Sequence, residues 1–175
     1  PNQAKQEIEE IIRNIYYLTS ESARKYTKEL SQILRYSNHI FTIGRGRDYA
    51  TAMEAALKIK EVSYIHAEGF AGGEIKHGPI AMIEHGTPCI VFVPNQENQD
   101  ILSNAQELKT RGAFIIGISE KKHEVFDYWI KVVGPDKFSP ILRIIPIQAL
   151  SYYLAVMKGL DPDKPRNLAK SVTVK

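Results

Sequence analysis

The stretch CIVFVPNQENQDILSNAQELKTRGAFIIGIS, residues 89–119, decides the fold class. It opens with the apolar run 89–94 and closes with a second apolar run at 113–119, and each has the length of a buried strand. Between them, residues 97–112 have the composition of a helix that ends at Gly112. Strands that are apolar on both faces occur in parallel sheets covered by helices on both sides, so this stretch predicts an α/β protein.

The same alternation of helix and strand continues on both sides of this stretch. A third apolar strand is predicted at 128–134, and HIFTI at 39–43 predicts a strand that ends in the glycine-rich turn 44–46. Residues 48–63 are rich in Ala, Leu, Lys and Glu and predict a helix, with Asp48 as its cap. We therefore expect a three-layer α/β/α fold around a mainly parallel sheet.

Helical and irregular segments flank this core. Apolar residues recur every three or four positions over 3–36 and predict two helices, broken near Thr19 and Ser20. Residues 64–86 contain five glycines and one proline, which predicts a loop-rich segment. A long apolar helix is predicted over 139–159, and Pro146 should bend or restart it.

The length of 175 residues suits one domain with one core. We expect a single unit over 1–175 that consists of the two N-terminal helices (3–36), an α/β core (37–159) and an extended tail (160–175). Pro1 is not an initiator methionine, so we also expect the chain to be part of something longer.

Composition excludes several classes of protein. Hydrophobic residues make up 43% and charged residues 25%, which is typical of a folded, soluble protein. The single cysteine, Cys89, excludes a disulfide within the chain, makes a thiolate zinc site unexpected and indicates a cytoplasmic protein. A net charge of +3, with the charges interspersed, does not resemble a nucleic-acid surface. We therefore expect no nucleic acid as a partner. No apolar run suggests a signal peptide or a membrane span, so we expect no membrane partner either.

The turn Gly44-Arg45-Gly46 has two interpretations. Its backbone N–H groups and the following helix N-terminus could bind an anion such as a phosphate. A dinucleotide-binding fingerprint would need a third glycine where the chain has Tyr49. The alternative is that the glycines serve the geometry of the turn alone.

Glu54, Lys58 and Glu61 are spaced by four and three residues and therefore share one face of the predicted helix. They could be an ordinary solvated row of ion pairs. They could equally be a carboxylate base beside a lysine, the arrangement needed to move a proton between adjacent carbons of a sugar.

Two further candidates lie in irregular segments. His77 follows the glycine-rich stretch, where ionisable groups on irregular backbone favour a functional site, although a structural histidine is the simpler alternative. Lys170 lies in the tail and could attack a carbonyl as an amine if the tail folds over a crevice, or it could belong to a frayed terminus. The five histidines follow no metal-ligand spacing, so we expect no metal.

Two long motifs carry a resemblance. The segments LKIKEVSYIHAEGFAGGEIKHGP (57–79) and DKPRNLAKSVTVK (163–175) resemble the glutamine:fructose-6-phosphate amidotransferases, also called glucosamine-6-phosphate synthases. The similarity runs from about Phe41 to the C-terminus. In that family a glutaminase domain is followed by two sugar isomerase (SIS) subdomains, and this chain resembles the second.

The resemblance implies a role for each candidate. Glu61 would be the base that moves a proton between C1 and C2 of the sugar, assisted by Lys58. His77 would open the sugar ring in the site of a neighbouring subunit. Lys170 would form an imine with the ketone of fructose 6-phosphate, and the backbone of Ala169 would line the pocket.

The chain also departs from the family pattern. The glutaminase of the family needs an N-terminal cysteine, but here the first residue is Pro1. The phosphate of the sugar is held mainly by a Ser/Thr-rich turn of the first SIS subdomain, whereas the turn here is GRGRDY. The family usually ends in Glu, and this chain ends in Lys175.

The resemblance therefore predicts the C-terminal half of a sugar isomerase domain. Its partners would be fructose 6-phosphate and glucosamine 6-phosphate, the first SIS subdomain, the glutaminase domain and a second copy in a homodimer, with no metal or organic cofactor. One alternative is a non-catalytic sugar-phosphate-binding module that senses its ligand or dimerises. Another is a stand-alone phosphosugar isomerase, which would need a phosphate-binding turn that we do not find.

Overall fold

The computed structural model describes residues 2–94 and 99–168. Five strands form one sheet in the order β2-β1-β3-β4-β5, and every neighbouring pair is parallel. The strands are β1 (His39–Gly44), β2 (His66–Ala71), β3 (Pro88–Phe92), β4 (Phe114–Ser119) and β5 (Tyr128–Lys131). The α-helices are α1 (Asn2–Leu18), α2 (Glu21–Leu34), α3 (Arg47–Ser63), α4 (Gln99–Thr110) and α5 (Ser139–Met157). Three short 3-10 helices are η1 (Glu74–Lys76), η2 (Pro79–Met82) and η3 (Asp136–Phe138).

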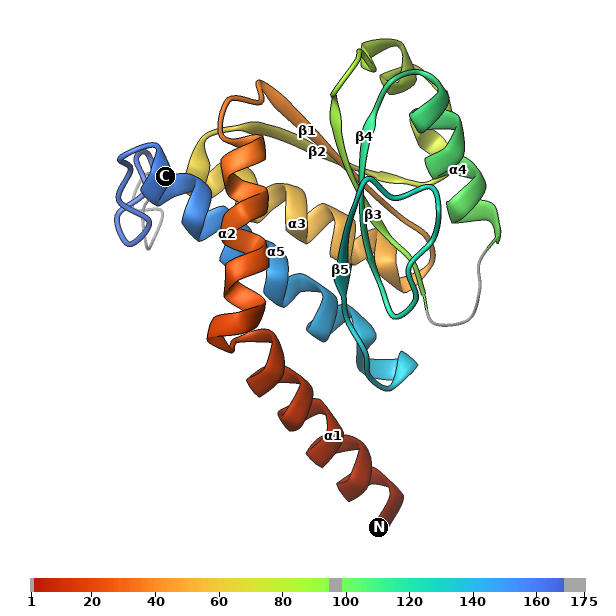
Figure 1. Cartoon of the computed structure of the whole chain (residues 1–175), viewed down its shortest axis with the longest axis vertical. Helices are drawn as coiled ribbons and strands as arrows, with labels where there is room; N and C mark the ends of the chain where they lie inside the picture. The colour runs from red at the N-terminus through yellow and green to blue at the C-terminus, as the bar shows by residue number, and fades with distance from the viewer. Residues whose placement is uncertain (1, 95–98, 169–175) are drawn as a thin grey trace, which may run out of the picture.

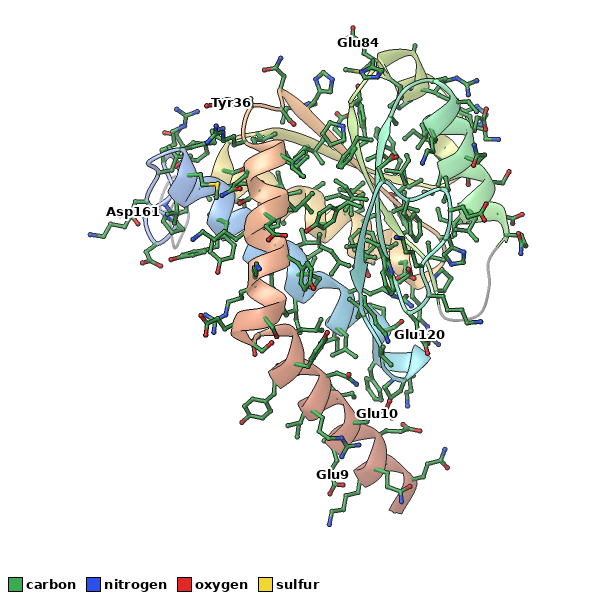
Figure 2. The ribbon with its side chains drawn as sticks, viewed as in Figure 1. Glu9, Glu10, Tyr36, Glu84, Glu120 and Asp161 are labelled. Atoms are coloured by element: carbon green, nitrogen blue, oxygen red, sulfur yellow. The ribbon has the colours of Figure 1, made fainter. Side chains whose placement is uncertain are left out.

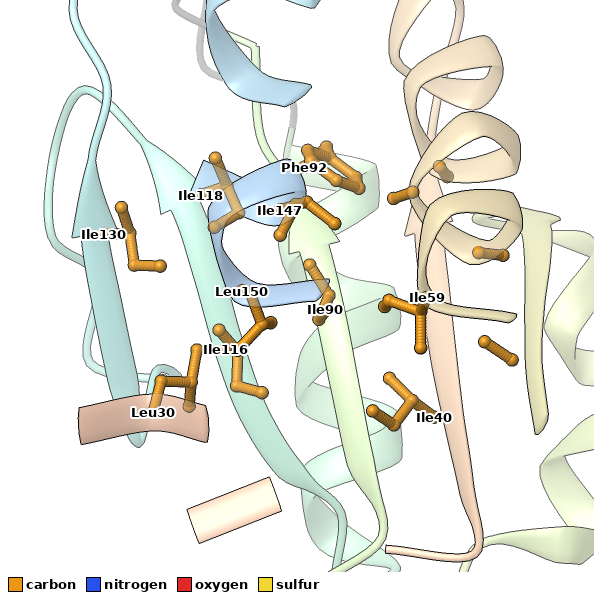
Figure 3. Packing of buried hydrophobic residues seen from close by; sticks show 14 of the residues in the cluster. Leu30, Ile40, Ile59, Ile90, Phe92, Ile116, Ile118, Ile130, Ile147 and Leu150 are labelled. Atoms are coloured by element: carbon orange, nitrogen blue, oxygen red, sulfur yellow. The ribbon is translucent and has the colours of Figure 1, made fainter. Parts of the chain in front are cut away.

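Helices cover both faces of this sheet, which confirms the predicted α/β architecture (Figure 1). On one face, side chains of α2, α3 and α5 pack against the strands, as with Ile147 and Leu150 above Ile90 and Ile116 (Figure 3). On the other face, α4, η1 and η2 pack against the strands in a second cluster that includes Phe41. The alternation of side chains along each strand therefore supplies one core on each face.

Most predicted elements are confirmed. The helix expected at 48–63 is α3, and the apolar runs expected as strands are β3, β4 and β5. The break near Ser20 is also present, because the Ser20 hydroxyl accepts a hydrogen bond from the Ala23 N–H at 3.3 Å and caps α2.

The prediction that residues 64–86 lack regular structure is wrong, because β2 lies within them. This edge strand pairs with β1 alone, and its sequence HAEGFA has no apolar alternation to reveal it. Gly69 has a packing reason: a Cβ there would lie 2.9 Å from the Met53 Cα on α3. The glycines that suggested a loop thus allow a helix to pack closely on a strand.

Asp48 does not cap α3, contrary to the prediction. Gly46 occupies the cap position, and the Asp48 carboxylate instead accepts a 2.5 Å hydrogen bond from Arg143 on α5. Both side chains are almost fully buried, so the charge of each is neutralised by the other.

Helix α5 runs without interruption through Pro146, so the predicted restart does not occur. By length and composition alone α5 could cross a membrane, a test that buried core helices also pass. Here Leu150 and Leu154 are fully buried in the core against the sheet and α3, as expected of a core helix.

Candidate active site

Helix α3 presents the predicted acidic and basic side chains together. The Lys58 ammonium lies 2.7 Å from a Glu61 oxygen and 3.6 Å from a Glu54 oxygen. The Lys58 and Glu61 side chains are each about 30% exposed, whereas Glu54 is 45% exposed. The predicted shared face is therefore confirmed, and Glu61 is the closer and less exposed of the two carboxylates.

The electrostatics of this group favour a charged lysine. The hydrogen bond that Lys58 donates to Glu61 raises the pKa of Lys58, and the charges of Glu61 and Glu54 also raise it, whereas partial burial lowers it. Lys58 is therefore a cation at neutral pH, suited to stabilise negative charge on a substrate oxygen rather than to act as a nucleophile.

The glycine-rich turn after β1 lies at the other end of α3. Twelve residues of helix, or about 18 Å at 1.5 Å per residue, separate Gly46 from Lys58. The structure therefore does not bring Gly44, Arg45 and Gly46 together with the Lys58–Glu61 pair.

Backbone geometry and one ion pair give the residues of this turn structural roles. A Cβ on Gly44 would lie 2.1 Å from the Asp48 carbonyl oxygen, and Gly46 has a positive φ of 56°. The Arg45 guanidinium donates a 2.6 Å hydrogen bond to Asp100 at the start of α4. Sequence spacing cannot predict this ion pair, because 55 positions separate its partners.

His77 follows η1 and is exposed. Its segment leaves the carboxyl end of β2, where the Gly72 N–H donates to the Gly44 carbonyl at 2.9 Å. Since β2 runs back along α3, this segment starts at the turn end of α3 and not at the Glu61 end.

The tail is described only as far as Leu168, so Ala169 and Lys170 lie outside the described residues. The described part lies beside the end of α3, on the side of the molecule away from Glu120 (Figures 1 and 2). The Arg166 N–H donates a 2.7 Å hydrogen bond to the Tyr64 hydroxyl, one helical turn beyond Glu61.

Within the described chain, the candidate residues belong neither to the cavity beside α1 and α2 nor to any metal-binding cluster. A cavity of about 260 Å³ lies between the α1–α2 corner, α5 and β5, and none of the candidate residues lines it. No group of three or more His, Cys, Asp or Glu side chains within residues 2–94 and 99–168 is placed to hold a metal.

A protein-family model described as the SIS domain matches residues 33–158. A glutamine–fructose-6-phosphate aminotransferase [isomerizing] of Pyrococcus horikoshii is 48% identical over 151 residues, which cover 84% of this chain and 25% of the relative. The aminotransferase of the same name from Clostridium perfringens is 42% identical over 97% of this chain and 28% of its own length. The chain thus spans about a quarter of the length of the curated relatives that it matches.

Solved structures share the fold. The C-terminal domain of a glucosamine-fructose-6-phosphate aminotransferase from Francisella tularensis superposes with a TM-score of 0.76 at 35% identity, over 82% of this chain and 42% of that one. A putative tagatose-6-phosphate ketose/aldose isomerase from Clostridium novyi superposes with a TM-score of 0.85 over 99% of this chain and 49% of that one. At 18% identity, this second likeness concerns the fold alone.

Proposed function

The chain belongs to the SIS domain family, and we propose that it is the C-terminal half of the sugar isomerase domain of a glutamine–fructose-6-phosphate aminotransferase. The observation that carries this proposal is the 2.7 Å Lys58–Glu61 pair on α3, in a chain that is 48% identical to an aminotransferase of that name. The complete enzyme would convert fructose 6-phosphate and glutamine to glucosamine 6-phosphate and glutamate.

Glu61 serves as the base in this proposal. When a ketose becomes an aldose, the Glu61 carboxylate removes a proton from C1 of the sugar and delivers it to C2. The opposite reaction moves the proton from C2 to C1. The positive charge of Lys58, which its raised pKa maintains, stabilises the negative charge that develops on the neighbouring sugar oxygen.

Lys170 is the amine that reacts with the ketone. It adds to C2 of fructose 6-phosphate, a water molecule leaves, and the resulting imine activates the sugar for amination. Lys58 is poorly suited to this step, because its hydrogen bond to Glu61 keeps it protonated. Ala169 would line the same pocket through its backbone.

His77 opens the sugar ring in the site of a second subunit. The start of its segment at the turn end of α3, away from Glu61, supports a donation across an interface. The proposal therefore includes a homodimer, in which each site takes Glu61 from one copy and His77 from the other.

The remaining parts of the site belong to the rest of the parent protein. Lys58 and Glu61 are partly exposed, so walls from another domain are needed to enclose a substrate. The first SIS subdomain would supply the phosphate-binding turn, since in this chain Gly44 and Gly46 serve the backbone geometry of the turn and Arg45 pairs with Asp100. A glutaminase domain would supply ammonia, and the whole enzyme would act in the cytoplasm.

The test is the substitution Glu61→Gln in the full-length parent. Loss of the base should slow exchange of the C1 proton with deuterated solvent by about 100-fold to 10,000-fold, while fructose 6-phosphate still binds. Glu54→Gln is the matched control, because Glu54 also contacts Lys58 but lies 3.6 Å away and is more exposed. Normal exchange in Glu61→Gln would reassign Glu61 to a solvated row of ion pairs. The same result would favour the alternative that this chain is a non-catalytic sugar-phosphate-binding module.

A further inference from the structure

The end of α3 and the tail meet at Tyr64. This residue is the C-cap of α3 in the left-handed conformation, with φ of 57°. Among the described residues, Tyr64 and Asn167 are the non-glycine residues with positive φ. They flank the same contact between α3 and the tail. A bulky side chain in this conformation is strained, so surrounding contacts must hold it there.

Two independent contacts join Tyr64 to Arg166. The Tyr64 hydroxyl accepts the 2.7 Å hydrogen bond from the Arg166 backbone N–H. The Arg166 guanidinium also stacks over the Tyr64 ring, 4.3 Å from its centroid. The same tyrosine therefore fixes both the backbone and the side chain of residue 166.

A third contact ties the end of α5 to the same place. The Lys158 ammonium donates a 2.8 Å hydrogen bond to the Ser63 carbonyl, next to Tyr64. Partial burial and the nearby Arg166 charge lower the pKa of Lys158. The segment between α5 and Arg166 is thus attached to α3 at both of its ends.

The attachment of the tail at Tyr64 lies close in sequence to two residues of the proposed site. Tyr64 follows Glu61 by three residues, or about 4.5 Å along the helix axis. Lys170 follows Arg166 by four residues, which span at most about 14 Å. Without the attachment, the hydrogen bond from the Leu160 N–H to the Ala155 carbonyl is an anchor ten residues before Lys170, which allows about 35 Å.

We propose that Tyr64 and Arg166 are positioning residues, which hold the tail at residue 166 close to the Glu61 end of α3 and thereby shorten the tether to Lys170, a residue outside the described part of the chain. This inference rests on the proposed function, because it assigns a role in the reaction of Lys170. A shorter tether raises the effective concentration of a reacting group without any contact to the substrate.

The test compares Tyr64→Phe with Tyr36→Phe in the full-length parent. Tyr64→Phe keeps the ring below Arg166 and removes only the hydroxyl that accepts its N–H. Tyr36→Phe is the matched control, because Tyr36 stacks with Arg35 in a similar cation–π pair but is 80% exposed.

Hydrogen exchange measures the attachment itself. In Tyr64→Phe, amides in the peptide 160–168 should exchange about two to ten times faster, the loss expected for one hydrogen bond. In Tyr36→Phe their exchange should not change. Unchanged exchange in Tyr64→Phe would overturn the inference, because the hydrogen bond would then not hold the tail.

Borohydride trapping measures the consequence for the reaction. With saturating fructose 6-phosphate, the initial rate at which reduced sugar accumulates on Lys170 should fall two- to tenfold in Tyr64→Phe, with an unchanged KM for the sugar. Faster exchange with an unchanged trapping rate would overturn the positioning role. An unaltered parent that traps no sugar on Lys170 would overturn the proposed function and this inference with it, and that result is seen before any substitution is made.

Discussion

Glycine residues determine how closely the backbone of α3 approaches the sheet. At Gly44 a Cβ would lie 2.1 Å from the carbonyl oxygen of Asp48 and 2.4 Å from its carbonyl carbon. These are backbone atoms of the first helical turn, so they cannot rotate away as a side chain could. Only glycine allows the chain to leave β1 and enter α3 at this separation.

The substitution Gly44→Ala should therefore destabilise the chain by about 3 kcal/mol, the upper end of the range for overpacking. Gly73→Ala is the control, because φ is −73° there and the nearest atom to the new Cβ is an Arg45 side-chain nitrogen at 3.5 Å. Its effect should stay within about 0.5 kcal/mol. Chemical denaturation of both variants measures the difference, and equal stabilities would contradict the crowding at Gly44.

Single residues also show which contacts of the fold and which parts of the site could be predicted from the sequence. The contact of Lys58 with Glu61 follows from helical spacing alone. The contact of Asp48 with Arg143 does not, because 95 positions separate the two residues and only the packed fold brings them together. The roles of His77 and Lys170 came from resemblance and not from spacing, and they stay predictions.

At the scale of elements, a hydrogen bond from the partly buried Tyr128 joins the edge strand β5 to α2. The Tyr128 hydroxyl donates to the Tyr26 carbonyl at 2.8 Å. Burial, with smaller contributions from Glu29 and Tyr26, raises the pKa of Tyr128 to about 12. The neutral phenol is therefore the form that the folded chain stabilises.

This raised pKa predicts a pH dependence of stability. In the unfolded chain Tyr128 loses its proton near pH 10, whereas in the folded chain it does so only near pH 12. Between these values the folded state holds more protons, so stability falls as the pH rises. The advantage of the unaltered chain over Tyr128→Phe should be complete below pH 10. It should decrease by about 1 kcal/mol by pH 12, allowing for solvent screening.

Urea denaturation of the two proteins at several pH values measures this difference. Because both proteins share all other titrating groups, their comparison isolates Tyr128. A difference that stays constant from pH 9 to pH 12 would show that α2 does not shield the Tyr128 hydroxyl from solvent.

The elements themselves were predictable to different degrees. Continuous apolar runs identified β3 and β4, since both faces of these central strands are buried. Strand β2 was missed because it lies at the edge, with partly exposed positions and a glycine that makes room for α3. Pro146 did not restart α5, because packing against the sheet and α3 holds the helix together on both sides of the proline.

At the scale of the whole molecule, the candidate residues occupy two ends of α3. The Lys58–Glu61 pair and the anchored tail lie at one end, and the segment that leads to His77 starts at the other. The homodimer proposal therefore places two half-sites on each chain, one at each end of α3. A different neighbouring subunit or domain would complete each of them. This geometry makes the homodimer proposal testable without a structure of the assembly.

Mixing His77→Ala subunits with Glu61→Gln subunits of the full-length parent should restore activity. In a mixed dimer one site contains both altered groups and the other contains both native groups, so equal random mixing should recover about a quarter of the native activity. Each variant alone should be inactive. No recovery, in a sample where mass spectrometry shows that subunits have exchanged, would place His77 and Glu61 in unrelated sites or in the same subunit's site.

The central claim is that this chain supplies reacting groups to a site that the rest of the parent protein completes. The most direct measurement is the turnover of fructose 6-phosphate by the 175-residue chain alone, beside the full-length parent, once circular dichroism has shown that the chain is folded. We predict background conversion by the folded chain and full activity in the parent, because the proposal assigns the phosphate-binding turn and the ammonia source to the rest of the parent. Turnover by the chain alone at about 1 per second or faster, a rate typical of enzymes, would contradict the half-site and identify a stand-alone isomerase.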